Sequence, residues 1–387
     1  MWRGNLNHHH MIISILKEPA DEKRVVCLPE MAGQLAKMNF EVNVESNAGA
    51  SSFASDLDYQ NAGTKTVTRD QALNADLILC INRPTDTDLS KIKAGAALLC
   101  VFQPLINKEV VLKFVESDTT TFSMDMVPRT TRAQSMDILS SQATVAGYKA
   151  VLTAATHLPK FFPMFMTAAG SIAPAKVLIL GAGVAGLQAI ATAKRLGAVV
   201  EAFDTRSAVK EEVKSLGAKF IEVEGAAESA AAGGYAVEQS KEFLEKQKQK
   251  IFESASKADV IITTAQIPGK KAPILITKET VNAMKSGSVI VDLAASTGGN
   301  CELTKNNEVF TTSNGVTIIG DSNLPSTMPS DASKMFGKNV MNFLKLILKD
   351  GQMNVNLEDD IVKGTCITHH KEVISPRVKD AMAQQAV

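Results

Sequence analysis

The chain has 387 residues, of which 45% are hydrophobic, and Lys plus Arg and Asp plus Glu each total 41, so the formal net charge is zero. This length exceeds what a single hydrophobic core usually serves, so we expect two domains. The balanced charge gives no basis for binding nucleic acid, and no run of about 18 apolar residues is present to insert directly into a membrane.

The first ten residues and the cysteines indicate how the chain is processed. Residues 1–10, MWRGNLNHHH, lack the apolar core of a signal peptide, and we interpret them as a leader or tag remnant outside the fold. The five cysteines are odd in number, have no metal-ligand spacing and mostly lie in apolar runs, which favours reduced core residues and no metal site. They are Cys27, Cys80, Cys100, Cys301 and Cys366.

Residues 11–145 alternate short apolar runs, typical of strands, with helical runs. The strand-like runs are MIISIL, EVNVES, LILCIN, ALLCVF and TTTFSMDM, and a helix is expected near Glu30 to Met38. This rhythm predicts βαβ units and a parallel sheet covered on both faces. The turn after MIISIL has no glycine, so we do not expect this domain to cradle a pyrophosphate. Residues from about 338 to 387 are expected to return to it.

A long helical stretch over about residues 146–167 is expected to bridge the domains and to end at PKFFPMFM. Within this stretch, His157 is expected to be a structural histidine with satisfied hydrogen bonds. The apolar cluster at its end favours an interdomain or dimer core, with a docking surface as the alternative. The cluster consists of Phe161, Phe162, Met164, Phe165 and Met166.

The segment 175–204, AKVLILGAGVAGLQAIATAKRLGAVVEAFD, carries the parts of a dinucleotide site in order: strand, GxGxxG, helix, strand and acid. Gly181, Gly183 and Gly186 allow a tight turn, close approach to a pyrophosphate and close helix packing. The helix N-terminus favours an anion. Asp204 suits an adenosine ribose and repels a 2′-phosphate, which predicts NAD rather than NADP. Arg206 is expected to lie over the adenine or in solvent.

The second domain, about residues 146–337, continues with the strand-like runs KFIEV, DVIITTA, SVIVDLA and VTIIG. The fold class is therefore α/β, with two Rossmann-like doubly wound parallel-sheet domains joined by long helices. Ligands bind such sheets at the carboxyl ends of the strands. The loops after Leu180, Phe203, Ala265 and Ala294 are expected to surround the cofactor.

Small residues fill the first half of residues 224–256, and a charged helix is expected over the second half. Gly233 and Gly234 precede Tyr235 and supply the freedom that a mobile lid needs, near residues 224–240. An ordinary surface connection is the alternative.

Residues 126–142, MVPRTTRAQSMDILSSQ, form an unusually polar segment before the bridging helix. A nicotinamide needs hydrogen-bond partners for its carboxamide, and Arg, Gln, Asp and Ser side chains supply them. The alternative is a capped helix start, with Ser135 or Asp137 as N-cap.

Five segments together resemble the NAD(H)-binding component of proton-translocating nicotinamide nucleotide transhydrogenases: PRTTRAQSMDILSSQ, GAGVAGLQAIATAKRLGAVV, AAGGYA, PGKKAPILIT and KSGSVIVDLA. The resemblance implies a homodimer that binds NAD(H) and passes hydride to NADP(H) on a partner component, coupled to proton movement through a membrane-spanning component. It also implies a peripheral place on the cytoplasmic side of a bacterial inner membrane. Because the chain has neither membrane helices nor an NADP-binding domain, it resembles the separately encoded subunit.

The resemblance also assigns site residues. It implies that Arg129, Gln134, Asp137 and Ser140 order the nicotinamide and that Tyr235 closes on the nucleotide. Polar Gln266 stands where an apolar residue would be expected. The residues expected to contact NAD(H) are Gly181, Ala182, Gly183, Val184, Ala185, Gly186, Asp204, Thr205, Arg206, Gly234, Tyr235, Thr264, Ala265, Gln266 and Leu293.

Two other functions fit parts of the sequence. Alanine dehydrogenase, a more distant resemblance, needs a proton-shuttling Lys and His, but Arg83 and Gln103 stand at those positions and neither titrates usefully. A non-catalytic NAD-binding module would have no use for so polar a segment or for a lid. Hydride passing between two nicotinamides needs alignment and exclusion of water rather than a general acid. We therefore expect Arg129 and Asp137 to act as an orienting pair.

Overall fold

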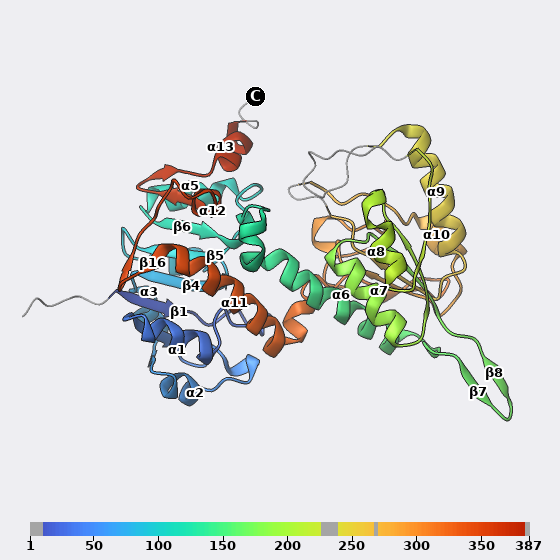
Figure 1. Cartoon of the computed structure of the whole chain (residues 1–387), viewed down its shortest axis with the longest axis horizontal. Helices are drawn as coiled ribbons and strands as arrows, with labels where there is room; N and C mark the ends of the chain where they lie inside the picture. The colour runs from blue at the N-terminus through green and yellow to red at the C-terminus, as the bar shows by residue number, and fades with distance from the viewer. Residues whose placement is uncertain (1–10, 226–238, 267–269, 384–387) are drawn as a thin grey trace, which may run out of the picture. The chain divides into compact units, whose positions relative to one another are not determined.

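The computed structural model describes residues 11–225, 239–266 and 270–383 (Figure 1). The chain forms two compact units, Met1–Gln142 with Ser326–Val387, and Ala143–Pro325. It leaves the first unit within helix α6 (Ile138–His157) and returns just before helix α11 (Pro329–Ile347). Each unit has a mainly parallel sheet with helices on it, so the predicted α/β class with two Rossmann-like domains is confirmed.

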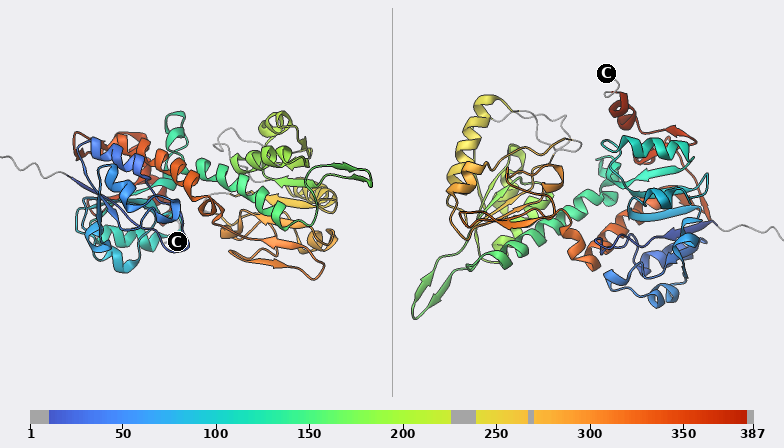
Figure 2. Two further views of the ribbon diagram at one scale, coloured as in Figure 1. Left: turned by 90° about the horizontal axis from the view of Figure 1, so that it is seen from below. Right: turned by 180° about the vertical axis from the view of Figure 1, so that it is seen from behind.

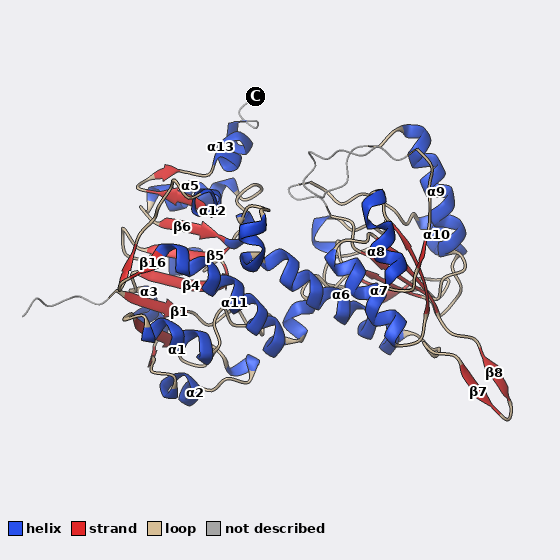
Figure 3. Ribbon diagram, in the orientation of Figure 1, coloured by secondary structure: helices blue, strands red, loops and turns tan. Residues whose placement is uncertain are grey.

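The first unit is built on an eight-stranded sheet in the order β19-β18-β6-β5-β4-β1-β2-β3 (Figure 3). The six strands from β1 to β6 run parallel, and β18 and β19 add an antiparallel edge. The bounds are β1 (Ile12–Ile15), β2 (Glu41–Glu45), β3 (Lys65–Val67), β4 (Leu77–Asn82), β5 (Ala97–Val101), β6 (Thr120–Ser123), β18 (Cys366–His369) and β19 (Glu372–Val373). Strand order reverses between β1 and β4.

Helices cover both faces of this sheet, because its strands are apolar on both sides. The shorter helices begin at polar caps: the Ser55 hydroxyl, for example, accepts from the Asp58 N–H at 3.2 Å. Helix α11 packs its apolar face, with Phe336 and Phe343, into the same core cluster as Ile13 and Ile15. The remaining helices are α1 (Pro29–Lys37), α2 (Asp56–Asn61), α3 (Arg69–Leu73), α4 (Asp86–Leu89), α5 (Lys108–Glu116), α12 (Asp360–Thr365) and α13 (Pro376–Ala383), and a short hairpin pairs β16 (Leu348–Lys349) with β17 (Gln352–Met353).

Strand β6 ends earlier than its apolar pattern predicts. The chain turns into a short 3-10 helix, Met124–Met126, directly after Ser123. The Ser123 hydroxyl donates to the Asp125 carboxylate at 2.5 Å and accepts from the Phe102 N–H at 3.2 Å. These local side-chain bonds replace the sheet pairing that the predicted strand would have continued.

The second unit has a seven-stranded sheet in the order β11-β10-β9-β12-β13-β15-β14. All neighbours are parallel except β14, which pairs antiparallel to β15 at the edge. The bounds are β9 (Lys176–Leu180), β10 (Val199–Phe203), β11 (Lys219–Phe220), β12 (Val260–Thr263), β13 (Val289–Asp292), β14 (Val309–Thr311) and β15 (Thr317–Ile319). Order reverses between β9 and β12, so a crevice for a ligand is expected there.

Strand β9 shows why this sheet is buried on both faces. Val177 and Ile179 pack into one apolar cluster, and Leu178 and Leu180 into another on the opposite face. Besides its part of α6, the unit contains the helices α7 (Val184–Arg195), α8 (Lys210–Ser215), α9 (Lys241–Ala255) and α10 (Lys278–Ala283). Helix α9 is the charged helix predicted before residue 256.

The bridging helix begins and ends earlier than predicted, and a hairpin follows it. Helix α6 ends at His157, and β7 (Phe165–Thr167) and β8 (Gly170–Ile172) form a two-stranded ribbon that extends from the second unit (Figure 2). Two prolines, Pro159 and Pro163, explain the early end of the helix, since proline cannot continue one. In this chain Phe162 is buried, whereas the other four residues of the predicted apolar cluster are exposed. Their place in a dimer core stays a prediction.

Other expectations have clearer outcomes. All five cysteines are buried and free, which confirms them as reduced core residues. His157 is exposed, but its Nδ1 bonds the Thr153 carbonyl at 2.9 Å, so it is satisfied as predicted. Among the residues that the structure describes, no helix is long and apolar enough to cross a membrane.

Candidate cofactor-binding site

The glycine turn after β9 has the geometry that its sequence predicts. Gly181 has a φ of 100°, a conformation that side chains disfavour, and a Cβ there would lie 2.5 Å from the Thr264 hydroxyl. A Cβ on Gly186 would lie 1.8 Å from the Gly181 carbonyl oxygen. By contrast, a Cβ on Gly183 would meet one atom, a guanidinium nitrogen of Arg206, at 3.9 Å. The first and third glycines serve the turn and the helix packing, and the second faces open space.

Helix α7 begins directly beyond this open position. Its N-cap is Gly183, with no side-chain cap, so the first N–H groups of α7 have no side-chain acceptor from that residue. Gly147 on α6 lets the start of α7 pack closely against it, because a Cβ at Gly147 would lie only 2.1 Å from the Ala185 carbonyl oxygen. Backbone N–H groups aimed at open space, at the positive end of a helix, form a cradle suited to phosphate.

Asp204 follows β10, as predicted, and its carboxylate is fully engaged by its own chain. It accepts from the Ala182 N–H at 2.7 Å and from the Arg206 N–H at 2.9 Å. The Arg206 side chain adds Nε at 2.8 Å and a terminal nitrogen at 2.6 Å. Arg206 therefore lies against Asp204 rather than in solvent, and the bond from Asp204 raises the pKa of Arg206. Thr205 lies half-buried between them in sequence.

The loops after β12 and β13 meet the glycine turn. The Thr264 hydroxyl donates to the Gly181 carbonyl at 3.0 Å, and the Thr264 N–H donates to the Leu180 carbonyl at 2.8 Å. Gln266 donates through Nε2 to the Leu293 carbonyl at 2.8 Å. This bond gives a physical reason for a polar residue at position 266, where an apolar one was expected.

Two residues in these loops were missed by the sequence analysis. Asp292, at the end of β13, and Asn300 are both 0% exposed and hydrogen-bonded throughout. The signals were present: an acid closes the apolar run VIVD, and an amide follows the pair Gly298 and Gly299. Neither residue belongs to a repeating sequence pattern, so the sequence alone does not show that Asp292 and Asn300 lie near the glycine turn.

The polar segment of the first unit begins helix α6. The Asp137 carboxylate accepts from the Ser140 N–H at 3.0 Å and from the Ser140 hydroxyl at 2.6 Å. Asp137 is thus an N-cap, the alternative interpretation, and that role does not exclude a second one. Arg129 and Gln134 have exposed side chains, and the Ser135 carbonyl accepts from Asn339 at 2.8 Å.

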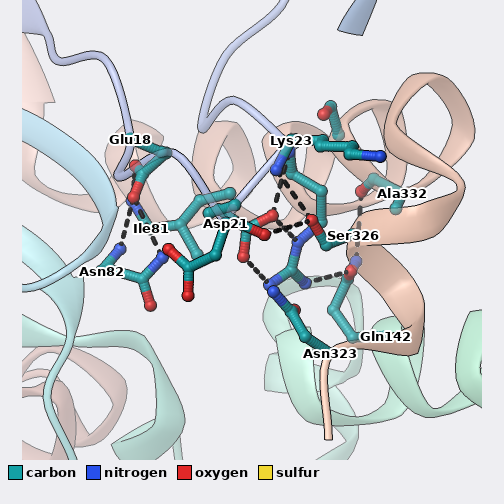
Figure 4. Close-up of polar contacts among 12 residues, drawn as sticks. Glu18, Asp21, Lys23, Ile81, Asn82, Gln142, Asn323, Ser326 and Ala332 are labelled. Carbon is teal, nitrogen blue, oxygen red and sulfur yellow. Dashed lines mark hydrogen bonds and ion pairs between the residues drawn. The ribbon is translucent and has the colours of Figure 1, made fainter. Parts of the chain in front are cut away.

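A second polar cluster lies where strand order reverses in the sheet of the first unit (Figure 4). Glu18, after β1, accepts from the N–H groups of Ile81 and Asn82 at 2.5 and 3.0 Å. Burial raises the pKa of Glu18 to about 7. Burial would also raise the pKa of Glu22, but its hydrogen bonds with Arg24 outweigh this and lower that pKa.

Arg24 connects this cluster to the start of α6. It donates to Gln142 at 2.8 Å, and Gln142 donates to the Ala332 carbonyl at 3.1 Å (Figure 4). The Lys23 N–H donates to the Ser326 hydroxyl at 2.7 Å (Figure 4). The loop after β1 therefore contacts Gln142, the last residue before the chain leaves the first unit, and Ser326, the first residue after it returns.

Arg83 and Gln103, which we expected at the positions of the Lys and His of alanine dehydrogenase, have side chains that cannot shuttle protons. Arg83 forms an ion pair with Asp86 at 2.6 Å. Gln103 is exposed, has a φ of 49°, and accepts through its carbonyl from Ile106 and Asn107. Gly234, Tyr235 and most of the predicted lid lie outside the described residues.

Comparison with known proteins decides the family. Residues 14–146 match the family "Alanine dehydrogenase/PNT, N-terminal domain", and residues 150–376 match "Alanine dehydrogenase/PNT, C-terminal domain". The first part of NAD(P) transhydrogenase subunit alpha from Rhodospirillum rubrum is 47% identical over 378 residues, covering 95% of this chain and 98% of that protein. The chain belongs to the NAD(P) transhydrogenase alpha-subunit family.

Two further similarities agree. NAD(P) transhydrogenase subunit alpha from Haemophilus influenzae is 44% identical over 97% of this chain and 74% of its own length. The crystal structure of transhydrogenase from Sinorhizobium meliloti superposes with a TM-score of 0.86 at 42% identity, covering 94% of this chain and 100% of that one. Alanine dehydrogenase from Mycolicibacterium smegmatis is more distant, 28% identical over 92% of this chain and 93% of its own. Both resemblances stated from the sequence are confirmed.

Proposed function

We propose that this chain binds NAD(H) and, with a partner component that holds NADP(H), transfers hydride directly from NADH to NADP⁺. A membrane-spanning component couples this transfer to proton translocation. The chain acts as a homodimer, peripheral to the cytoplasmic side of a bacterial inner membrane. Membership of the transhydrogenase alpha-subunit family supports this proposal, because the relatives' names give NAD(P) transhydrogenase as the enzyme and call the matching protein one subunit, or one part of a subunit, of it.

The observation that carries the proposal is the open cradle at Gly183. Space for a Cβ at this position, beside an uncapped helix start, fits the close approach of a pyrophosphate. Ala182, Val184, Ala185 and Gly186 supply the surrounding backbone. Asp204, at the end of the neighbouring strand, fits the hydroxyls of an adenosine ribose once they displace the Arg206 side chain from its oxygens, and its charge disfavours a 2′-phosphate.

The loops beyond β9 complete the proposed site. Thr264, Ala265, Gln266 and Leu293 form its wall on the side of β12 and β13. Gly234 and Tyr235, outside the described residues, are further proposed contacts of the nucleotide. When bound, NAD(H) supplies the hydride, so the chain's own residues have to orient it and exclude water.

In the proposed reaction, Arg129, Gln134, Asp137 and Ser140 order the nicotinamide. None of these residues needs to exchange a proton, since hydride transfer between two nicotinamides forms and breaks C–H bonds only. Asp137 holds Ser140 by two hydrogen bonds, so the chain itself fixes the orientation of the pair. A preformed site of this kind lowers the entropy cost of alignment.

One mixing experiment tests the proposal against alanine dehydrogenase activity. The purified chain is combined with NADH, an oxidised NADP analogue and a partner NADP-binding component, with and without alanine or pyruvate. We expect analogue reduction that requires the partner and is unaffected by alanine or pyruvate. Reduction of NAD⁺ by alanine without the partner would contradict the proposal and support the dehydrogenase function.

A further inference from the structure

Asn300 is a buried carboxamide in the loop after β13. Its Oδ1 accepts from the Ala265 N–H at 3.0 Å, and its Nδ2 donates to the carbonyls of Ala265 at 2.9 Å and Pro273 at 2.8 Å. The side chain is 0% exposed, so these three partners satisfy it in place of water. A single side chain therefore holds both backbone polar groups of Ala265.

Asp292 holds Asn300 in turn. Its carboxylate accepts from the N–H groups of Ala294, Asn300 and Cys301 at 3.0, 2.8 and 3.0 Å. The hydroxyls of Thr263 and Thr304 add bonds of 2.8 and 2.6 Å.

The loop can wrap this closely around the carboxylate because of Gly299. Gly299 has a φ of 79°, and a Cβ there would lie 2.9 Å from an Asp292 oxygen. Donors from β12 and from the loop after β13 thus fix one buried charge. Asp292 therefore fixes the position of Asn300, and Asn300 fixes the position of Ala265.

The loop that Asn300 holds contacts the glycine turn through Thr264. A Cβ on Gly181 would lie 2.5 Å from the Thr264 hydroxyl and 3.3 Å from the Ala265 nitrogen, so the two loops are in close contact. Any shift of Ala265 would therefore move the wall beside the glycine turn. Asn300 determines where that wall stands without itself facing solvent.

Sheet order indicates which half of a dinucleotide would be affected. Asp204 follows β10, on one side of β9, whereas Ala265 and Asn300 follow β12 and β13 on the other side. A dinucleotide lies across the point where strand order reverses. With the adenosine ribose at Asp204, the nicotinamide half lies over the loops after β12 and β13.

From this geometry, and resting on the proposed function, we propose that Asn300 is a positioning residue for the nicotinamide half of bound NAD(H). It acts through the backbone of Ala265 and has no contact with the adenosine half. Loss of its donors therefore weakens binding of NADH and leaves binding of 5′-AMP, the adenosine half alone, unchanged.

The test compares two Asn-to-Asp variants of the full chain. In Asn300→Asp the side chain keeps its size and its acceptor but cannot donate to the carbonyls of Ala265 and Pro273. In the matched control, Asn314→Asp, an amide that donates to the Val281 carbonyl at 2.9 Å near the β14–β15 edge is changed in the same way. Affinities for NADH and for 5′-AMP are measured by calorimetry.

We expect Asn300→Asp to weaken NADH binding about tenfold or more, because Ala265 shifts when its carbonyl loses its donor and the wall beside the nicotinamide half moves with it, with AMP binding changed less than about twofold. The control should change neither affinity. Equal loss of NADH and AMP binding, or no loss of either, would overturn the inference. Wild-type chain that binds neither ligand would instead refute the proposed function. If Asn300→Asp does not fold, Asn300→Ser, which removes the same donors without adding charge, carries the same test.

Discussion

The pairing of Asp204 with Arg206 makes a sharp prediction about nucleotide choice. The side chain of Asp204 is 7% exposed and accepts one hydrogen bond from Ala182 and three from Arg206. In Asp204→Asn the negative charge is lost. An amide NH₂ group, which can only donate, also replaces one of the two oxygens that now accept hydrogen bonds. The Arg206 side chain then has a neutral amide oxygen in place of the two carboxylate oxygens that it contacts now.

The magnitude follows from the kind of bond that is removed. A hydrogen bond to a charged group contributes about 1.5–3 kcal/mol, which corresponds to roughly tenfold or more in affinity. We therefore expect Asp204→Asn to bind NADH at least about tenfold more weakly. Binding of NADPH should not weaken, since the carboxylate that repels a 2′-phosphate is gone. The NADH-to-NADPH preference should fall by a similar factor.

Nucleotide fluorescence titrations of the wild-type chain and the variant measure both affinities. Glu201→Gln is the matched control, because Glu201 lies on the same strand and pairs with exposed Lys219 at 3.0 Å. This control should leave both affinities unchanged. An Asp204→Asn chain that kept the full NADH preference would refute the assignment of the ribose to Asp204.

Four further variants test other parts of the structure. Gly186→Ala places a Cβ 1.8 Å from the Gly181 carbonyl and should destabilise the fold by about 1–3 kcal/mol in urea unfolding, whereas Gly183→Ala should keep stability and lose NADH affinity; equal stabilities would contradict this. Because the folded pKa of Glu18, about 7, lies above its ordinary 4.5, its contribution to stability is full below about pH 4.5 and is lost as pH rises through 7. Glu18→Gln should remove that fall, of up to about 1.4 kcal/mol per pH unit, from unfolding curves, and an unchanged slope would count against it. Asp137→Asn should keep the helix cap, since Asn also caps well, but slow hydride transfer without a new pH dependence; a shifted pH optimum would argue for an acid–base role.

The sequence predicted the features that depend on local pattern. Strand β9, helix α7 and Asp204 stand where the apolar run, the glycines and the acid place them, because their signals lie within one βαβ unit. Glycine spacing also predicted which positions would be crowded and which one open. The fold class followed from the same alternation of strands and helices.

Features that depend on contacts distant in sequence were not predictable. Asn300 bonds Ala265 across 35 positions, and no periodic pattern marks such a pair. The engagement of Asp204 by Arg206 depends on a backbone turn that residue types alone do not fix. Strand β14 was missed because it is short and lies at the sheet edge, with Val309 exposed.

The hairpin of β7 and β8 was not predicted, for a different reason. Its apolar residues suggested burial, but Met166 is 79% exposed in this chain. Apolar composition predicts burial against something, and a single sequence does not say whether the covering surface belongs to the same chain.

Because all five cysteines are buried, we expect the native chain to react only slowly with thiol reagents. Burial raises the pKa of Cys27 to about 12 and that of Cys301 to about 11, so almost no thiolate forms at neutral pH. Four of the five thiols lie in the first unit, and Cys301 lies in the second. The rate at which each is trapped would therefore measure how often its own unit opens. A reporter cysteine added on the surface would be labelled against a dark background.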